Sequence, residues 1–324
     1  MQYFDVFNGD ADGICALHQL RLDSPRPDAA LVTGVKRDII LLKKIEEIHN
    51  SAITVLDISL DRNRTSLARL LEQHNEVLYI DHHFSGPIPD VGKIEVHIDP
   101  QPMTCTSIIV DSLLNGKYRP WAIAGAFGDN LDEAALNLAA DKSLVESEIE
   151  QLKEIGILLN YNGYGATIKD LFFPPNVLFQ EVHSFEDPFD FFSTSQVMEQ
   201  LRAGYRDDMS RAMSSEPLIE KSQGRIFQLA GEPWARRVSG VFSNTLAREC
   251  PDIAHGLIIP NSDSTLRISV RAPLSNRTGA DVLCRQFPTG GGRAAAAGIN
   301  NLPPELKDSF LQAFMEQFTK GKGP

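Results

Sequence analysis

Two aspartates in a short turn near the start of the chain are the first residues that could hold metal ions. Asp10 and Asp12 lie in the segment 8–13, NGDADG, which follows a short apolar run. Carboxylates at positions i and i+2 of a turn can each face a different ion, and Gly13 frees the backbone to enter a helix. Taken alone, the pattern is equally typical of an aspartate-rich turn that caps a helix.

Asp81, His82 and His83 form the second motif, again after an apolar run. A carboxylate combined with imidazoles is the ligand mixture that manganese, zinc and iron prefer. Because adjacent side chains at the end of a strand point apart, one histidine could bind metal while the other meets the substrate. Asp81 could then orient one of the imidazoles. A histidine pair that is merely buried, or that caps an element, is the alternative.

Two single aspartates could complete a cluster with these motifs. Asp57 follows the apolar run ITVL, and Asp129 follows a glycine in the sequence AFGD. Either residue alone is more typical of a turn or a cap. Together with the two motifs, they would supply a bridging carboxylate and a further ligand for two ions spaced for phosphoryl transfer.

The last candidate site is the glycine-rich segment 289–298, TGGGRAAAAG, in the last part of the chain. Three consecutive glycines would let the backbone approach a phosphate, and the arginine that follows could grip it with two hydrogen bonds. A flexible connector followed by tight alanine packing is the alternative. The residues that we assign to a phosphate clamp are Gly290, Gly291, Gly292, Arg293 and Arg271.

These motifs require elements that bring them together, and the first 130 residues predict such elements. Apolar runs at 3–7, 53–57 and 77–81 are typical of strands, and a helix is expected to open near Gly13. Each run ends in an aspartate or is soon followed by one. Ligands bind at the carboxyl ends of strands in open α/β sheets, so we predict a mostly parallel sheet flanked by helices, with one shared site.

The rest of the sequence has the pattern of a helical segment followed by a second domain. Leucine and isoleucine recur at three- and four-residue spacings from about 120 to 159, and prolines among phenylalanines break this pattern at 172–195. We expect a catalytic domain at 1–190, a helical linker at 191–220 and a smaller α/β domain at 221–324, with substrate bound in a cleft between the domains. In the second domain, strands are predicted at 224–229, 256–260 and 266–271, and helices near 241–250, 279–287 and 304–318.

Composition limits the partners of the chain. The formal net charge of −12 over 324 residues argues against binding long duplex DNA, which normally requires a broad basic surface. A small phosphate substrate is compatible with this charge, because bound divalent ions supply local positive charge. No apolar run reaches the roughly 20 residues that span a bilayer, and the N-terminus lacks the features of a leader. We therefore expect a cytoplasmic protein with no membrane partner.

The motifs, taken in order along the chain, resemble those of the DHH phosphoesterase superfamily, in the branch that carries a C-terminal DHH-associated domain. The likeness spans essentially the whole sequence, and five motifs occur in the family order. The resemblance assigns catalysis to His83, at the scissile phosphate, and to Asp57, which would bridge the ions. It implies that the glycine-rich segment holds the other end of the substrate. The implied metal ligands are Asp10 and Asp57 for a first ion, and Asp12, Asp57, His82 and Asp129 for a second.

Two positions depart from the family pattern. Many members have a histidine just upstream of the first aspartate, where this chain has Val6 and Asn8. The amide oxygen of Asn8 could still serve manganese or magnesium, but a site short of one charge would need more metal in solution. Arg293 stands where the family usually has a histidine. Arginine can hold a phosphate but cannot transfer protons near neutral pH.

We therefore predict a hydrolase, either a phosphodiesterase or a phosphatase, that acts on nucleotides, dinucleotides or short oligonucleotides. Two divalent ions, manganese or alternatively magnesium, would activate a shared water. A single-strand exonuclease is one rival, although the aromatic segment 172–192 carries four acidic residues where a basic groove is expected. A catalytically silent nucleotide-binding module is the other rival. The sequence leaves open whether the chain forms a homodimer.

Overall fold

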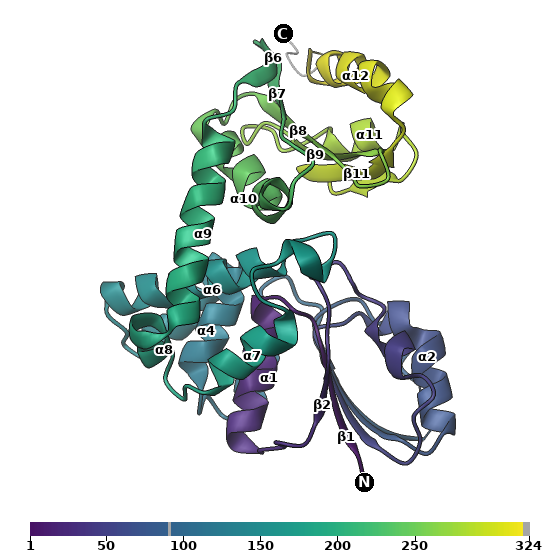
Figure 1. The fold of residues 1–324 in the computed structure, drawn as a ribbon, viewed down its shortest axis with the longest axis vertical. Helices are drawn as coiled ribbons and strands as arrows, with labels where there is room; N and C mark the ends of the chain where they lie inside the picture. The colour runs from purple at the N-terminus through teal and green to yellow at the C-terminus, as the bar shows by residue number, and fades with distance from the viewer. Residues whose placement is uncertain (90–91, 320–324) are drawn as a thin grey trace. The chain divides into compact units, whose positions relative to one another are not determined.

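The computed structural model describes residues 1–89 and 92–319 of the chain. The chain divides into two compact units, Met1–Gly204 and Tyr205–Pro324, and each unit has its own sheet (Figure 1). The division falls within helix α9, Gln196–Met213. Among the described residues, no helix combines the length and the apolarity needed to cross a membrane.

A five-stranded, wholly parallel sheet forms the centre of the first unit, as the sequence predicts. Its strand order is β2-β1-β3-β4-β5, so the three strands expected from the sequence are direct neighbours. The register pairs Phe7 with Leu56 and Leu56 with Ile80, which brings the carboxyl ends of these strands to the same edge. The strands are β1 (Tyr3–Phe7), β2 (Ala30–Val32), β3 (Ala52–Leu56), β4 (Glu76–Asp81) and β5 (Lys93–Ile98).

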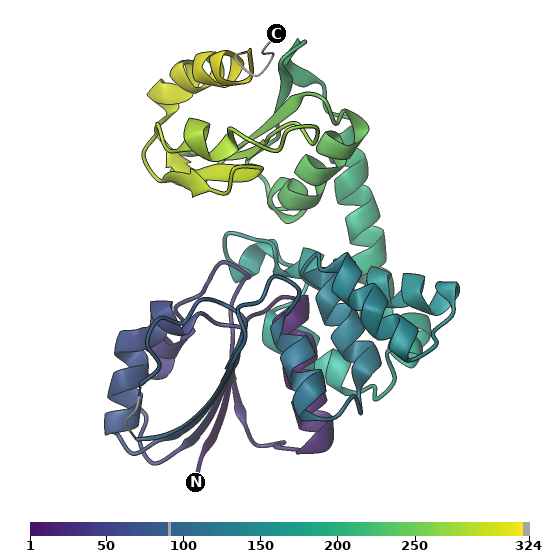
Figure 2. The same cartoon turned by 180° about the vertical axis from the view of Figure 1, so that it is seen from behind.

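Helices cover both faces of this sheet. Figures 1 and 2 show α1 (Ala11–Asp23) and α2 (Leu60–Glu72) on opposite sides of the strands. On the α2 side, Leu67 packs in one buried cluster with Val55 and Tyr79 of the sheet. Because parallel strands are apolar on both faces, this double cover is what the nearly unbroken apolar runs require.

Helices also make up the rest of the first unit. The segment 172–195, expected to interrupt the helical pattern, contains two short helices with a proline in the first turn of each, where proline is well tolerated. The remaining helices of this unit are α3 (Thr106–Leu113), α4 (Arg119–Gly128), α5 (Asp132–Asp141), α6 (Glu146–Gly163), α7 (Pro175–His183) and α8 (Pro188–Thr194), with 3-10 helices at Leu41–Ile45 and Ile168–Asp170.

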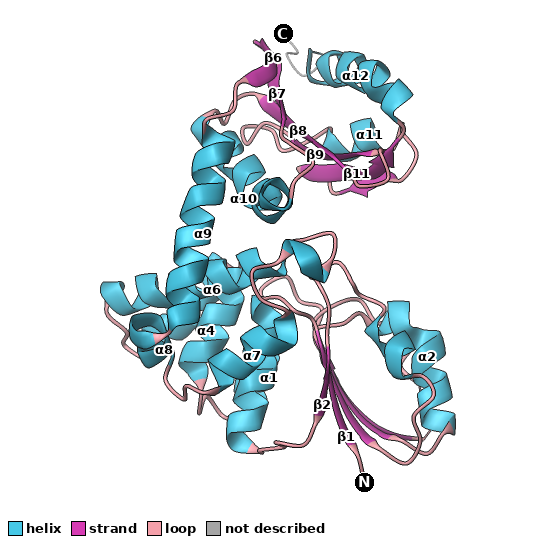
Figure 3. Ribbon diagram, in the orientation of Figure 1, coloured by secondary structure: helices cyan, strands magenta, loops and turns pink. Residues whose placement is uncertain are grey.

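A six-stranded mixed sheet forms the second unit, which agrees with the predicted smaller α/β domain (Figure 3). Phe310 and Phe314 of the last helix pack against its strands in a single buried core. The glycine run is itself an edge strand, β10, which the sequence did not predict. The elements are β6 (Pro217–Lys221), β7 (Gly224–Gln228), α10 (Pro233–Glu249), β8 (Ala254–Pro260), β9 (Leu266–Arg271), α11 (Ala280–Cys284), β10 (Gly290–Gly292), β11 (Ala296–Leu302), a 3-10 helix at Pro304–Leu306 and α12 (Lys307–Thr319).

Candidate metal centre

Asp10 is fixed by the turn that joins β1 to α1. It is the N-cap of α1, and its Oδ1 accepts a hydrogen bond from the backbone N–H of Gly13 at 3.1 Å. A side chain at Gly13 would place its Cβ 2.3 Å from the carbonyl oxygen of Asn8, so only glycine fits there. Because Oδ1 serves the helix, Oδ2 of Asp10 remains to face other groups.

Asp12 joins α1 to α3. Its two carboxylate oxygens accept hydrogen bonds from the backbone N–H groups of Thr106, at 2.8 Å, and Ser107, at 2.7 Å. These N–H groups open the first turn of α3, where they have no partner within the helix and where negative charge is favoured. The carboxylate is almost completely buried and therefore rigidly placed.

Asp57 follows β3 in a backbone conformation that is rare for a residue other than glycine. Its φ angle is 57°, in the left-handed region, where aspartate and asparagine are the side chains best tolerated. Such a conformation costs about 1–3 kcal/mol. The hydroxyl of Thr106 donates a hydrogen bond to Asp57 Oδ1 at 3.4 Å. Burial, followed by the charges of Asp10 and Asp12, raises the pKa of Asp57 well above its usual value.

His82 presents one ring nitrogen to the aspartates. Its Nδ1 lies 3.1 Å from the carbonyl oxygen of Thr104, which can only accept, so Nδ1 carries the proton. The Nε2 atom then offers its lone pair to the cluster, 3.4 Å from Asp57 Oδ1. The same atom lies 3.7 Å from Asp129 Oδ2 and 4.0 Å from Asp12 Oδ2. A neutral imidazole oriented by a carbonyl in this way is the usual arrangement of a metal-binding histidine.

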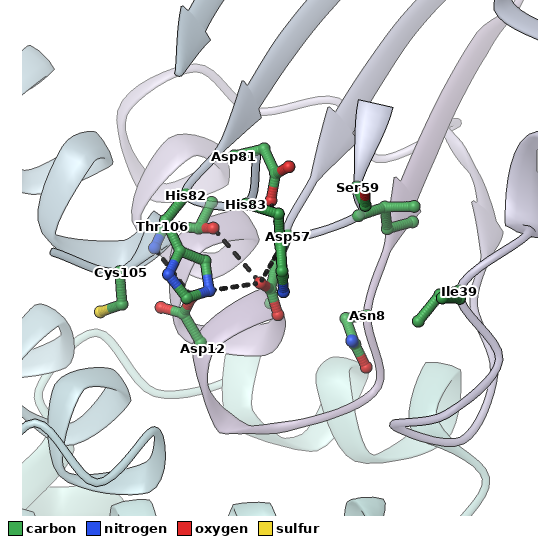
Figure 4. Close-up of polar contacts among 12 residues, drawn as sticks. Asn8, Asp12, Ile39, Asp57, Ser59, Asp81, His82, His83, Cys105 and Thr106 are labelled. Atoms are coloured by element: carbon green, nitrogen blue, oxygen red, sulfur yellow. Dashed lines mark hydrogen bonds and ion pairs between the residues drawn. The ribbon is translucent and has the colours of Figure 1, made fainter. Parts of the chain in front are cut away.

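His83 points toward the same cluster but is more exposed, with 44% of its side chain accessible. Its Nδ1 donates to Asp81 Oδ1 at 2.7 Å, and Asp81 is fully buried at the end of β4. Burial would lower the pKa of His83, but the hydrogen bond and the charge of Asp81 raise it above the usual value. Figure 4 shows Asp12, Asp57 and both histidines converging at the ends of the strands.

Asp129 reaches the centre from the end of α4. Gly128, just before it, lies so close to α1 that a Cβ would be 2.3 Å from the Cβ of Ala11. This close packing of α4 on α1 brings the Asp129 carboxylate to the start of α1. Burial raises the pKa of Asp129, Lys36 opposes this effect, and the charges of Asp12 and Asp10 add to it.

Lys36 is a member of the centre that the sequence did not reveal. Its Nζ lies 2.6 Å from Asp10 Oδ2 and 3.2 Å from Asp129 Oδ1. A third acceptor, Oδ1 of Asn160 on α6, is 3.1 Å away. Burial would lower the pKa of Lys36, but the charges of Asp10, and next of Tyr164 and Asp129, raise it well above the usual value. Burial would raise the pKa of Asp10, but the charge and the hydrogen bond of Lys36 lower it.

The donor set fits a divalent cation. Three carboxylates lie within about 4 Å of His82 Nε2, and this mixture of oxygen and nitrogen ligands suits manganese. Asp57, His82 and His83 alone bring ligand atoms within 4.8 Å of one another. All six predicted residues of the first unit, Asp10, Asp12, Asp57, His82, His83 and Asp129, lie in this centre.

The predicted clamp residues lie in the second unit. Gly290–Gly292 form β10, which pairs antiparallel with β11. A Cβ at Gly290 would lie 1.8 Å from the carbonyl oxygen of Cys284, so this glycine is required for packing, whereas Gly291 has nothing within 4 Å of its Cβ position. Arg293 is exposed, and Nε of Arg271 on β9 donates to Asn244 Oδ1 at 2.8 Å.

The first unit places aspartates and histidines at the carboxyl ends of β1, β3 and β4, and a unit with a mixed sheet follows it. The fold is shared with solved structures that include a RecJ exonuclease and a pGpG-specific phosphodiesterase. No protein-family model matches the sequence, and no curated protein matches it either.

Three solved structures illustrate the likeness. A RecJ exonuclease bound to manganese aligns with 100% of this chain and 91% of its own, with a TM-score of 0.62 and 14% identity. The pGpG-specific phosphodiesterase PggH from Vibrio cholerae aligns over 98% and 99%, with a TM-score of 0.54 and 14% identity. An exopolyphosphatase-related protein from Bacteroides fragilis aligns over 98% and 91%, with a TM-score of 0.50 and 15% identity.

Proposed function

We propose that this chain is a metal-dependent phosphoesterase that hydrolyses phosphate esters in nucleotides, dinucleotides or short oligonucleotides. The observation that carries the proposal is the convergence of Asp12, Asp57 and Asp129 on the free ring nitrogen of His82. This convergence occurs on a fold whose solved examples include an exonuclease and a dinucleotide phosphodiesterase. Both of those proteins cleave phosphoesters, so the fold and the site point to the same chemistry.

Asp12, Asp57, His82 and Asp129 would hold the ion. When bound there, a divalent cation lowers the pKa of water and stabilises negative charge on phosphoryl oxygens. Manganese is the metal that we propose, because the ligands mix imidazole with carboxylate and because a RecJ structure of this fold contains manganese. This ion is the second ion of the family pattern, and the resemblance also implies the first ion, at Asp10 and Asp57.

His83 would contact the scissile phosphate. Its ring is held by Asp81 through Nδ1, so that Nε2 is the nitrogen available to a substrate. The ring is partly exposed, and Nδ1 lies 3.9 Å from Asp57 Oδ1, which places it at the rim of the metal centre. A donor in this position would stabilise the charge that develops on a phosphoryl oxygen.

We further propose that the glycine-rich segment binds the part of the substrate distant from the reaction. Open space surrounds the Cβ position of Gly291 on the edge strand β10, and Arg293, two residues later, is exposed. A guanidinium can hold a phosphate with two hydrogen bonds, and it keeps its charge at any physiological pH. Gly290 and Gly292 on β10, and Arg271 on β9 of the same sheet, would complete this clamp.

A panel of substrates tests the proposal. The purified chain should be assayed with manganese on dinucleotides, cyclic dinucleotides, a bisphosphorylated nucleoside and long single-stranded DNA. The acidic net charge of −12 favours the small members of this panel. Preferred turnover of long single-stranded DNA would favour the exonuclease. Binding of nucleotides without turnover of any substrate, at any manganese concentration, would favour the silent binding module.

A further inference from the structure

The ammonium group of Lys36 lies where a cation would be expected. Of the two carboxylates that the resemblance assigns to a first ion, Asp10 already has a positive charge 2.6 Å from its Oδ2. Its Oδ1 is taken by the N–H of Gly13. Both oxygens of Asp10 therefore have partners supplied by the chain itself, and one partner is a positive charge, whereas the partners of Asp12 are neutral backbone N–H groups.

The hydrogen-bonding capacity of Lys36 is filled. An ammonium has three N–H donors, and three acceptors lie within 3.2 Å of Nζ: Asp10 Oδ2, Asn160 Oδ1 and Asp129 Oδ1. The group therefore has no remaining donor for a substrate. Its role is that of a fixed charge among the carboxylates, which is the role of a bound cation.

The backbone around Lys36 is anchored on both sides. Its N–H donates to the carbonyl oxygen of Gly163 at 2.9 Å, and its carbonyl oxygen accepts from Nδ2 of Asn8 at 3.3 Å. Two residues earlier, the carbonyl oxygen of Gly34 would lie only 2.1 Å from a Cβ at Gly9. The loop that carries Lys36 thus lies directly against the turn that carries Asp10.

Asn8 links this arrangement to the missing histidine. Many members of the family have a histidine in this stretch, where this chain has Val6 and Asn8, and the amide nitrogen of Asn8 holds the backbone of Lys36. Within the described residues, Oδ1 of Asn8 accepts no hydrogen bond. The rival interpretation is that this oxygen serves a first ion and that Lys36 moves aside when the ion binds.

We infer that Lys36 replaces the first ion, so that the centre takes one divalent cation at Asp12, Asp57, His82 and Asp129. The inference rests on the proposed function. One divalent ion and the ammonium together compensate three of the four negative charges of Asp10, Asp12, Asp57 and Asp129. A second divalent ion at Asp10 would stand next to the ammonium in a mostly buried site, where repulsion between like charges is strong.

The test counts the manganese ions bound per chain and measures whether they are magnetically coupled. Manganese binding to the wild-type chain should be followed by calorimetry and by electron paramagnetic resonance. We expect one ion per chain and the six-line spectrum of an isolated Mn²⁺. Lys36→Met removes the charge and keeps most of the volume, so this variant should bind two ions and give the broadened spectrum of a coupled pair. Lys44→Met is the matched control, because Lys44 is an exposed lysine that pairs with Asp38 nearby.

Three outcomes would overturn the inference or its basis. Two coupled ions in the wild-type chain would show that Lys36 does not replace an ion, while the phosphoesterase proposal would stand. A single ion in Lys36→Met would show that the lysine is not what excludes the second ion. No ion in the wild-type chain would refute the metal-dependent function itself. If Lys36→Met fails to fold, Lys36→Gln replaces it, and the wild-type count alone still separates one ion from two.

Discussion

The candidate metal centre and the glycine-rich segment differ in how firmly their surroundings hold them. In the centre, Asp10, Asp12 and Asp57 are buried, and each accepts a hydrogen bond from a backbone N–H or a hydroxyl. In the segment, Arg293 is exposed and Gly291 has open space around it. A preorganised centre suits one fixed reaction, whereas an exposed edge suits the binding of varied phosphates. Changes in the two regions should therefore affect different measured quantities.

The largest effect is expected from Asp57→Asn in the metal centre. Asparagine tolerates the left-handed backbone at this position, so the change removes the charge without adding strain. With manganese in large excess, we expect turnover of the best substrate to fall by about a thousandfold or more, roughly 4 kcal/mol of transition-state stabilisation. Asp61→Asn, at an exposed aspartate on α2, is the control. Near-normal turnover in Asp57→Asn would remove this residue from the centre.

His82 and His83 should behave differently although they are adjacent. His82→Ala removes the nitrogen that faces three carboxylates, so the purified variant should lose bound metal. His83→Ala should keep its metal and lose about a hundredfold in kcat, the typical effect of removing one donor to a developing charge. Metal content and kcat measured on both variants decide this. Equal metal loss in the two variants would refute the division of roles.

The sequence predicted the sheet well because burial leaves a strong pattern. The apolar runs at 3–7 and 266–271 match β1 and β9 residue for residue. The edge strands β2 and β5 were missed, since β2 has only three residues and the run KIEVHI of β5 alternates with polar side chains. The strand β10 was missed because three glycines carry no strand propensity, and its pairing with β11 comes from tertiary context.

The candidate site was partly predictable for a related reason. Asp10, Asp12, Asp57, Asp81 and the histidines follow apolar strands, so the sequence places them at one edge. Lys36 gave no such signal, because a single lysine in a loop is most often a solvated surface residue. Its partner Asn160 lies far along the chain on α6, and only the packing of the helices brings the two together.

A moderate effect is expected from Arg293→Ala in the glycine-rich segment. The guanidinium can clamp a phosphate but cannot move protons, so KM should rise while kcat changes little. Loss of one charge-assisted contact, about 1.5–3 kcal/mol, corresponds to roughly ten- to a hundredfold in kcat/KM. Arg293→Lys should recover part of this loss. Arg285→Ala, an exposed arginine on the same unit, is the control, and an unchanged KM in Arg293→Ala would favour the packing connector.

The smallest effect concerns stability, and it tests whether the rigidity of the centre has a cost that the exposed segment does not share. The pKa of Asp57 is raised by burial and by the neighbouring carboxylates, so the folded state holds this proton more tightly than the unfolded state. As pH rises above the ordinary carboxyl pKa of about 3.9, the unfolded chain ionises first, and the free energy of unfolding falls until the raised pKa is passed.

With manganese removed by a chelator, the wild-type chain should therefore lose stability relative to Asp57→Asn as pH rises from about 3.9 toward the raised pKa of Asp57, because asparagine cannot ionise. Urea unfolding of both proteins across this range measures the difference, and excess manganese should reduce it by stabilising the ionised carboxylate. Arg293→Ala, in contrast, should follow the wild-type profile at every pH. If the difference in free energy of unfolding between wild type and Asp57→Asn were the same at every pH, the carboxylate cluster would not destabilise the ion-free centre. The candidate metal centre and the glycine-rich segment would then differ only in how far their side chains are exposed to solvent.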